Sequence, residues 1–170
     1  MRVAIVENTE GTQHGLVGVA LQEVAAQIVV FQPWRDGRLP QPGSFDALVC
    51  FGGEQNALDD AIHPYLTDLA KLMFDQAQAG VAVLGVCLGS QVMARGAGAQ
   101  NMIGTTPEFG WCEVELTAEG RADPVLSQLP ARFPSFEWHS DTFTLPPGAV
   151  HLAGNGTAAV QCFRLGRAGY

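Results

Sequence analysis

One cysteine lies between two glycines at the point where a buried strand is expected to turn into a helix. The segment GVCLGSQ, residues 85–91, follows the apolar run 81–86 and centres on Cys87. A sharp strand-to-helix turn lifts its central side chain out of the sheet, and the glycines let the two elements approach closely. The helix N terminus would favour a thiolate. The pattern predicts a nucleophile, although a structural cysteine in a tight turn fits the same spacing.

The other cysteines, Cys50, Cys112 and Cys162, are spaced too widely for a disulfide framework or a metal cluster. We expect them to be reduced, mostly buried small hydrophobic residues, and we expect Cys87 to be the most acidic of the four. No cluster of acidic residues suggests a metal, and no glycine-rich phosphate loop follows the first apolar run. The sequence therefore predicts neither a metal nor a cofactor.

Size and charge limit the classes of protein to consider. The chain has 170 residues, of which 47% are hydrophobic, enough for one substantial core and a single domain over residues 1–170. Nine basic residues against 17 acidic ones give a net charge of -8, which argues against nucleic acid and anionic membranes as partners. The apolar N-terminal segment MRVAIVEN is too short for a signal peptide or a spanning helix, because Glu7 and Asn8 interrupt it. This favours a cytoplasmic location.

Apolar runs rich in branched residues alternate with stretches of helical period, which is typical of an α/β domain with a largely parallel sheet. In the first half, strands are expected at 3–6, 28–31, 47–51 and 81–86, and helices at 15–27, at 64–80 and after Gly89. The proline-rich stretch 33–44 is expected to be a plain connection. After Gly96, strands are expected at 111–116, 135–138, 150–152 and 159–163, with no helix between them. The predicted fold is a three-layer α/β domain with flanking helices and a β-rich C-terminal part.

Four segments stand out in order along the chain, FGGE at 51–54, GVCLGSQ at 85–91, EFGW at 108–111 and WHSDTF at 138–143, and together they resemble the class I glutamine amidotransferase family. FGGE at 51–54 looks like the Gly-Gly loop that supplies an oxyanion-hole N–H, and GVCLGSQ at 85–91 is similar to the family's G-(I/V)-C-x-G-x-Q. EFGW at 108–111 is similar to the E-x-G-W that introduces the family's β-rich insert. WHSDTF at 138–143, followed by LPPGA, resembles the W-H-G-D-T-F-x-L-P-x-G-A of the branch often labelled GMP synthase-like.

This resemblance implies a flavodoxin-like fold and hydrolysis of the glutamine side-chain amide. The Cys87 thiolate would attack the carboxamide carbon, ammonia would leave, and water would cleave a γ-glutamyl thioester. The backbone N–H groups of Gly53 and Leu88 would stabilise the oxyanion. The resemblance also implies glutamine as the substrate, a synthetase or acceptor protein as the partner, and no cofactor. The residues it places around the substrate are Gln91, His139, Ser140 and Asp141.

The chain departs from the family pattern in three places. Glu54 follows the Gly-Gly pair where most relatives have proline, and Ser140 replaces a glycine, which would be strained if that backbone needs a positive φ. The family's general base and its orienting acid come from an H-x-E segment just after the region that matches 163–170. We therefore expect the domain to be truncated at its C terminus.

Two functions remain open at this point. The domain either hydrolyses glutamine, or it is a catalytically silent shortened relative that acts as a binding or interaction protein. In the silent case we expect negligible turnover and an unpaired sheet edge that favours self-association. A substitution of His139 for the missing base is a weaker hypothesis, and a cysteine hydrolase of another class is opposed by the EFGW and WHSDTF segments. We also expect the strands ending near Phe51 and Val86 to be neighbours.

Overall fold

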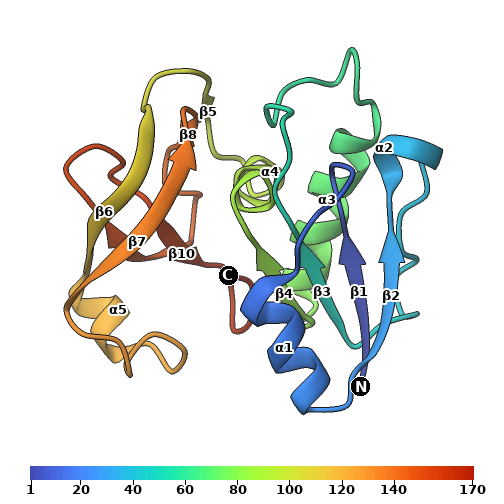
Figure 1. The fold of residues 1–170 in the computed structure, drawn as a ribbon, viewed down its shortest axis with the longest axis horizontal. Helices are drawn as coiled ribbons and strands as arrows, with labels where there is room; N and C mark the ends of the chain where they lie inside the picture. Colours follow the sequence, from blue (N-terminus) through green and yellow to red (C-terminus); the bar gives the residue numbers. More distant parts are fainter.

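The computed structural model describes residues 1–170, and its two main sheets occupy the two halves of the molecule (Figure 1). The first sheet is parallel, in the order β2-β1-β3-β4, and consists of β1 (Arg2–Val6), β2 (Gln27–Phe31), β3 (Ala47–Cys50) and β4 (Ala82–Gly85). The second is antiparallel, in the order β10-β9-β6-β7, and consists of β6 (Glu108–Leu116), β7 (Arg132–His139), β9 (Val150–Gly154) and β10 (Cys162–Arg164). A small pair is formed by β5 (Asn101–Met102) and β8 (Thr142–Phe143).

Helices cover both faces of the parallel sheet. The helices are α1 (Gly15–Glu23), α2 (Pro33–Asp36), α3 (Tyr65–Gln78), α4 (Leu88–Gly96) and α5 (Ala118–Ala122). Leu66, Leu69 and Met73 recur at helical spacing along α3 and are fully buried against the sheet. Val17 and Leu21 of α1 pack on the other face. The predicted three-layer α/β fold with a β-rich C-terminal part is therefore confirmed.

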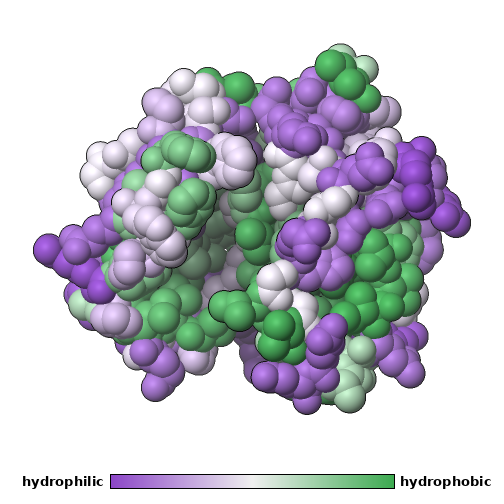
Figure 2. All heavy atoms as spheres, viewed as in Figure 1, coloured by the Kyte–Doolittle hydropathy of each residue, from purple (hydrophilic) through white to green (hydrophobic).

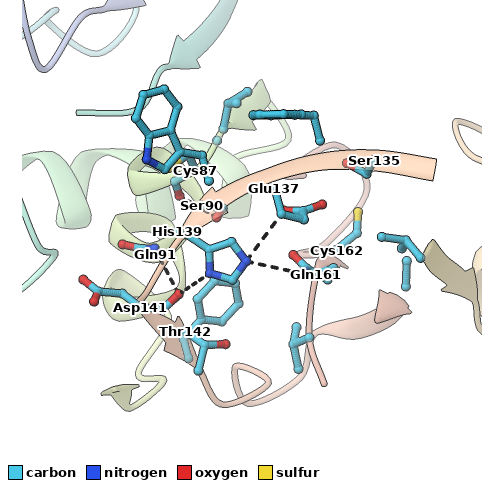
Figure 3. A pocket seen from close by; sticks show the side chains of 18 of the residues that line it. Cys87, Ser90, Gln91, Ser135, Glu137, His139, Asp141, Thr142, Gln161 and Cys162 are labelled. Atoms are coloured by element: carbon cyan, nitrogen blue, oxygen red, sulfur yellow. Dashed lines mark hydrogen bonds and ion pairs between the residues drawn. The ribbon is translucent and has the colours of Figure 1, made fainter. Parts of the chain in front are cut away.

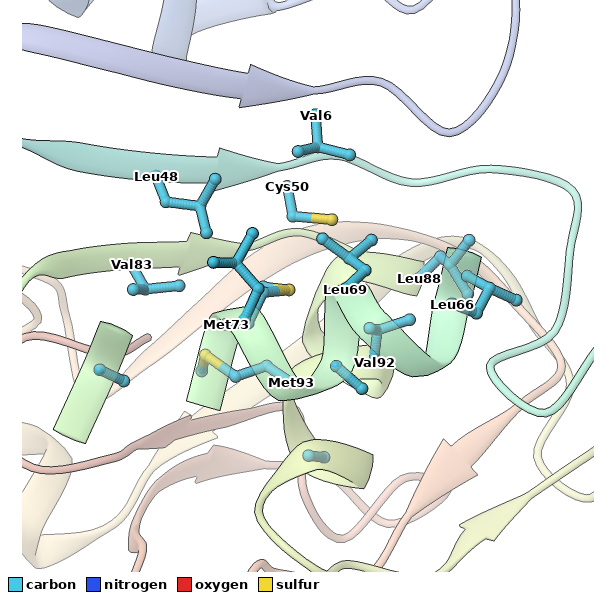
Figure 4. Packing of buried hydrophobic residues seen from close by; sticks show 14 of the residues in the cluster. Val6, Leu48, Cys50, Leu66, Leu69, Met73, Val83, Leu88, Val92 and Met93 are labelled. Atoms are coloured by element: carbon cyan, nitrogen blue, oxygen red, sulfur yellow. The ribbon is translucent and has the colours of Figure 1, made fainter. Parts of the chain in front are cut away.

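Alternation along the strands divides the core in two. One set of strand residues packs with α3 and α4 in the main hydrophobic cluster, and Figure 4 shows part of this cluster. The strand residues in it include Val6, Leu48, Cys50 and Val83. The intervening residues Val3, Ile5, Val49 and Phe51 form a smaller cluster with α1. These strands therefore pack on both faces of the sheet up to the ends where the loops containing Gly53 and Cys87 begin.

Two short helices were not expected from the sequence. The stretch predicted as a plain connection contains α2, which begins at Pro33, a residue whose fixed φ suits a first helical turn. Between β6 and β7 lies α5, where the Thr117 side chain accepts a hydrogen bond from the Gly120 N–H at 2.9 Å. The prediction that no helix lies between the C-terminal strands is therefore wrong, because a cap at Thr117 stabilises a helix too short to show a period.

The last residues of the chain pair with β4. Val83 donates to the Ala168 carbonyl at 2.8 Å, Gly85 donates to that of Tyr170 at 2.7 Å, and Tyr170 donates back to Val83 at 2.8 Å. The prediction of unpaired backbone groups at this edge is therefore wrong for β4, because the segment after β10 supplies their partners. No helix of the structure is long and apolar enough to cross a membrane.

Asp123 ties the C-terminal segment to the second sheet. Its fully buried carboxylate accepts hydrogen bonds from Arg164 Nε at 2.8 Å, Tyr170 Oη at 3.1 Å and the Val125 N–H at 2.9 Å. Burial acts to raise the pKa of this carboxyl group, but the hydrogen bonds outweigh burial and lower the pKa below its ordinary value of 3.8.

Replacing Asp123 should therefore destabilise the fold in a pH-dependent way. Because the pKa is lower in the folded state, the stabilisation is present above the unfolded-state pKa and is lost as the pH falls through the folded-state pKa. Asp123→Asn should lower the free energy of unfolding at pH 7 by about 3 kcal/mol. The difference from wild type should shrink at acid pH in urea titrations. Glu119→Gln, at an exposed position of α5, is the matched control; an equal loss in both variants would contradict the assignment.

Candidate active site

Cys87 occupies the predicted sharp turn between β4 and α4. Its backbone has φ 55° and ψ −115°, and it is one of two non-glycine residues with a positive φ. The flanking glycines make this conformation possible, since a Cβ on Gly89 would lie 2.1 Å from the Cys50 carbonyl oxygen and one on Gly85 would lie 2.7 Å from Gly89. Backbone strain of this kind at a residue beside a cavity is typical of a functional position.

The Gly-Gly loop lies beside this cysteine. β3 and β4 are neighbours, with Cys50 opposite Gly85, so the loops that follow them meet as predicted. A Cβ on Gly52 would lie 3.2 Å from the Cβ of Cys87 and 3.5 Å from its sulfur, so only glycine fits there without a shift. Gly53, Leu88 and Cys87 line one cavity of about 370 Å³.

Asn8, at the carboxyl end of β1, holds the loop after β3 in place. Its side-chain amide donates to the Phe51 carbonyl at 2.7 Å and accepts from Tyr65 Oη at 3.2 Å. The backbone carbonyl of Asn8 accepts a hydrogen bond from Gln55 Nε2 at 2.6 Å. Sequence reasoning missed this residue, although a polar side chain directly after a buried strand next to β3 was the available signal.

The four residues that the resemblance placed around the substrate all line this cavity. Gln91, buried on α4, faces the loop after β7, and its Nε2 lies 3.5 Å from the Asp141 carbonyl. Cys87, Gln91, His139 and Asp141 also line a second cavity of about 600 Å³ between the two sheets (Figure 3). Ser140 does not have a positive φ, so its replacement of glycine brings no backbone strain.

His139 is held by contacts to both ring nitrogens. Nδ1 lies 3.0 Å from the Asp141 carbonyl oxygen, and Nε2 lies 3.1 Å from a carboxylate oxygen of Glu108. The same carboxylate accepts from Asn155 at 2.8 Å and from Gln161 at 2.7 Å. Because oxygen acceptors occupy both nitrogens, this ring is arranged as a fixed part of the pocket, and the hypothesis that His139 replaces the base finds no support in its geometry.

The larger cavity has hydrophobic walls and also acidic side chains in its lining. Figure 2 shows a hollow between the two halves of the molecule with hydrophobic residues on its walls. Its charged or titratable lining side chains include Glu137, His139 and Asp141, and no lysine or arginine lines either cavity. Sequence reasoning did not single out Glu137 or Gln161, although alternation along β7 would have placed Glu137 and His139 on the same face.

The electrostatic surroundings of Cys87 differ from those expected. Burial raises the pKa of its thiol above 9.0, the Leu88 N–H lowers it, and the carboxylates of Glu137 and Asp141 raise it further. The start of α4 therefore favours the thiolate as predicted, but its one N–H does not offset burial and two negative charges, so the pKa is raised and not lowered. The shift is nevertheless smaller than at Cys50 and Cys162, where burial raises the pKa to about 12 and about 11. All four cysteines are free.

Comparison with known proteins places this geometry in a family. The profile described as "Glutamine amidotransferase class-I" matches residues 17–163. The chain is 31% identical over 117 residues to the putative glutamine amidotransferase-like protein YfeJ of Salmonella typhimurium, covering 67% of this chain and 49% of that protein. It is 26% identical over 163 residues to a glutamine-hydrolysing GMP synthase subunit from Sulfolobus acidocaldarius, covering 95% of this chain and 80% of that protein.

A solved structure gives the same result. The crystal structure of a glutamine amidotransferase from Thermotoga maritima superposes with a TM-score of 0.88 at 27% identity, covering 98% of this chain and 72% of that one. The chain belongs to the class I glutamine amidotransferase family, and it spans about half the length of the Salmonella relative.

Reactivity should distinguish Cys87 from the three less exposed cysteines. Its side chain is exposed to the cavity and its pKa is raised less than those of Cys50 and Cys162, so iodoacetamide should label it first in the folded protein. Because the pKa is raised, labelling should be slow at pH 7 and should accelerate as the pH rises. Peptide mapping across a pH series checks this, and labelling concentrated at Cys112 or Cys162 would contradict it.

Proposed function

We propose that this domain hydrolyses the side-chain amide of glutamine, with Cys87 as the nucleophile. The observation that carries the proposal is the strained turn at Cys87, which presents its sulfur to a cavity shared with the Gly52–Gly53 loop and the start of α4. Membership of the class I glutamine amidotransferase family supports glutamine as the substrate.

In the first step the sulfur attacks the carboxamide carbon, and the carbonyl oxygen becomes an oxyanion. The backbone N–H groups of Gly53 and Leu88 are the proposed donors to that oxygen. Donors fixed in place before the reaction are worth most where charge develops, and loss of one such donor costs a rate factor of about 10²–10³ in other enzymes. Gln91, His139, Ser140 and Asp141 are the proposed substrate-binding residues on the facing side of the cavity.

The tetrahedral species then collapses to a γ-glutamyl thioester as the C–N bond breaks, and the leaving nitrogen gains the proton that the Cys87 thiol has lost and departs as ammonia. Water adds to the thioester carbon and releases glutamate and the thiol. A positioned imidazole typically contributes about 10²–10⁴-fold to such proton transfers. His139 does not take this role in the proposal, since both its nitrogens are occupied. The proposed user of the ammonia is a synthetase or acceptor protein, by analogy with the Sulfolobus GMP synthase relative.

A second candidate is a silent glutamine-binding protein. The raised pKa of Cys87, with two carboxylates nearby, favours this alternative because it disfavours the thiolate. In that case the same cavity would bind glutamine without forming a thioester.

Trapping the acyl intermediate separates the two candidates. With glutamine and hydroxylamine, the protein should form γ-glutamyl hydroxamate, because hydroxylamine attacks the thioester in place of water. Cys87→Ala should abolish the product, while Cys112→Ala, on β6, should retain it. Absence of hydroxamate in wild type, together with equal glutamine affinity in wild type and Cys87→Ala, would favour the binding protein and overturn the catalytic proposal.

A further inference from the structure

Strand β2 is an open edge of the parallel sheet. It pairs with β1 alone and lies at the outer side of the molecule (Figure 1). Edge strands of natural proteins are commonly protected by a charge, a proline or a bulge. The sequence of β2, QIVVF, contains no charge and no proline, and its register with β1 is continuous from Gln27 to Phe31. None of these three features therefore prevents β2 from pairing with another strand.

The backbone groups of β2 alternate in direction. The Gln27 N–H donates to the residue before β1 at 2.9 Å, and the Phe31 carbonyl accepts from the residue after β1 at 3.0 Å. In a regular strand every second residue faces the same neighbour, so Val29 also faces β1, whereas Ile28 and Val30 face outwards. The N–H and carbonyl groups of these two residues are therefore available to another strand.

The side chains of β2 leave apolar surface on both faces of the sheet. Val29, 55% exposed, lies on the face where Phe31 packs against the main hydrophobic cluster. Val30, 43% exposed, lies on the opposite face with Ile28. Figure 2 shows hydrophobic residues at the surface in the region of β2. An uncharged strand with apolar neighbours can be approached by a second molecule although each chain has a net charge of -8.

We propose that β2 pairs with β2 of a second copy of this chain, antiparallel and about a twofold axis at Val29. In this register Ile28 lies opposite the partner's Val30, and each such pair of outward-facing residues exchanges two hydrogen bonds. Val29 lies opposite the partner's Val29. The two parallel sheets join into one continuous sheet, and the interface is self-complementary, as a twofold dimer requires.

Charges at the two ends of β2 favour a second copy as the partner. Glu23 precedes β2 and Arg35 follows it, and both residues are exposed. Neither takes part in an ion pair within the chain. Glu23 and Arg35 are equally far along the chain from Val29, so a twofold axis there places the positive end of one β2 beside the negative end of the other.

The pairing leaves the candidate active site open. β2 and β4 form opposite edges of the parallel sheet, and Cys87 follows β4. The proposal therefore does not depend on the reaction that Cys87 performs. Because the two copies of β2 run in opposite directions, the carboxyl ends of the two parallel sheets, with their active sites, face opposite sides of the dimer.

Analytical ultracentrifugation over a concentration series tests the proposal. Wild type should approach twice the 18.0 kDa of one chain as its concentration rises. Val29→Lys should raise the dimer dissociation constant about tenfold or more, because like charges lie opposite each other at the axis. Val29→Glu should do the same, and an equimolar mixture of the two variants should recover the dimer. Val19→Lys, at a 48% exposed position of α1, is the matched control and should leave the dimer intact.

Hydrogen exchange gives a second test in wild type alone. The amides of Ile28 and Val30 should exchange more slowly as the protein concentration rises, whereas the Val29 amide, bonded to β1, should be equally protected throughout. A monomer at every concentration, or a folded Val29→Lys variant that dimerises as wild type does, would overturn the proposal. A mixture of the two charged variants that stays monomeric would overturn the axis at Val29.

Discussion

The close packing of α4 onto the end of β3 is the constraint on which the candidate site depends. A Cβ at position 89 would lie 2.1 Å from the Cys50 carbonyl oxygen, so α4 can begin where it does only because Gly89 has no side chain. That approach forces the turn between β4 and α4 to be sharp and leaves Cys87 at φ 55°. The packing of the parallel sheet on both faces holds this strained backbone in place.

The two sheets contribute different properties to the site. The parallel sheet supplies the sulfur and the glycine loop, and Asn8 fixes their relation through hydrogen bonds to the loop after β3. The antiparallel sheet supplies the carboxylates of Glu108 and Glu137 and the imidazole ring of His139. Burial and the carboxylates near the sulfur both raise the pKa of the Cys87 thiol and so oppose its ionisation.

The sequence allowed the layer architecture and the sharp turn to be predicted, because both follow from local patterns. Branched apolar runs marked the strands of the first sheet, and the glycine spacing around Cys87 marked the turn. The helices α2 and α5 could not be predicted, since four or five residues show no period and depend on a proline or a cap. The raised pKa of Cys87 could not be predicted for another reason. The carboxylates of Glu137 and Asp141 come from strand and loop positions about fifty residues away, and only the tertiary fold brings them near the sulfur.

The central claim is that Cys87 and the adjacent glycine loop form a site that recognises the glutamine carboxamide. The most direct measurement is mass spectrometry after incubation with the diazoketone analogue of glutamine, whose electrophilic carbon takes the place of the carboxamide. We expect a single adduct on Cys87, slowed by added L-glutamine and unaffected by D-glutamine. An adduct spread over Cys87, Cys112 and Cys162, or one on Cys87 that L-glutamine does not slow, would contradict the claim.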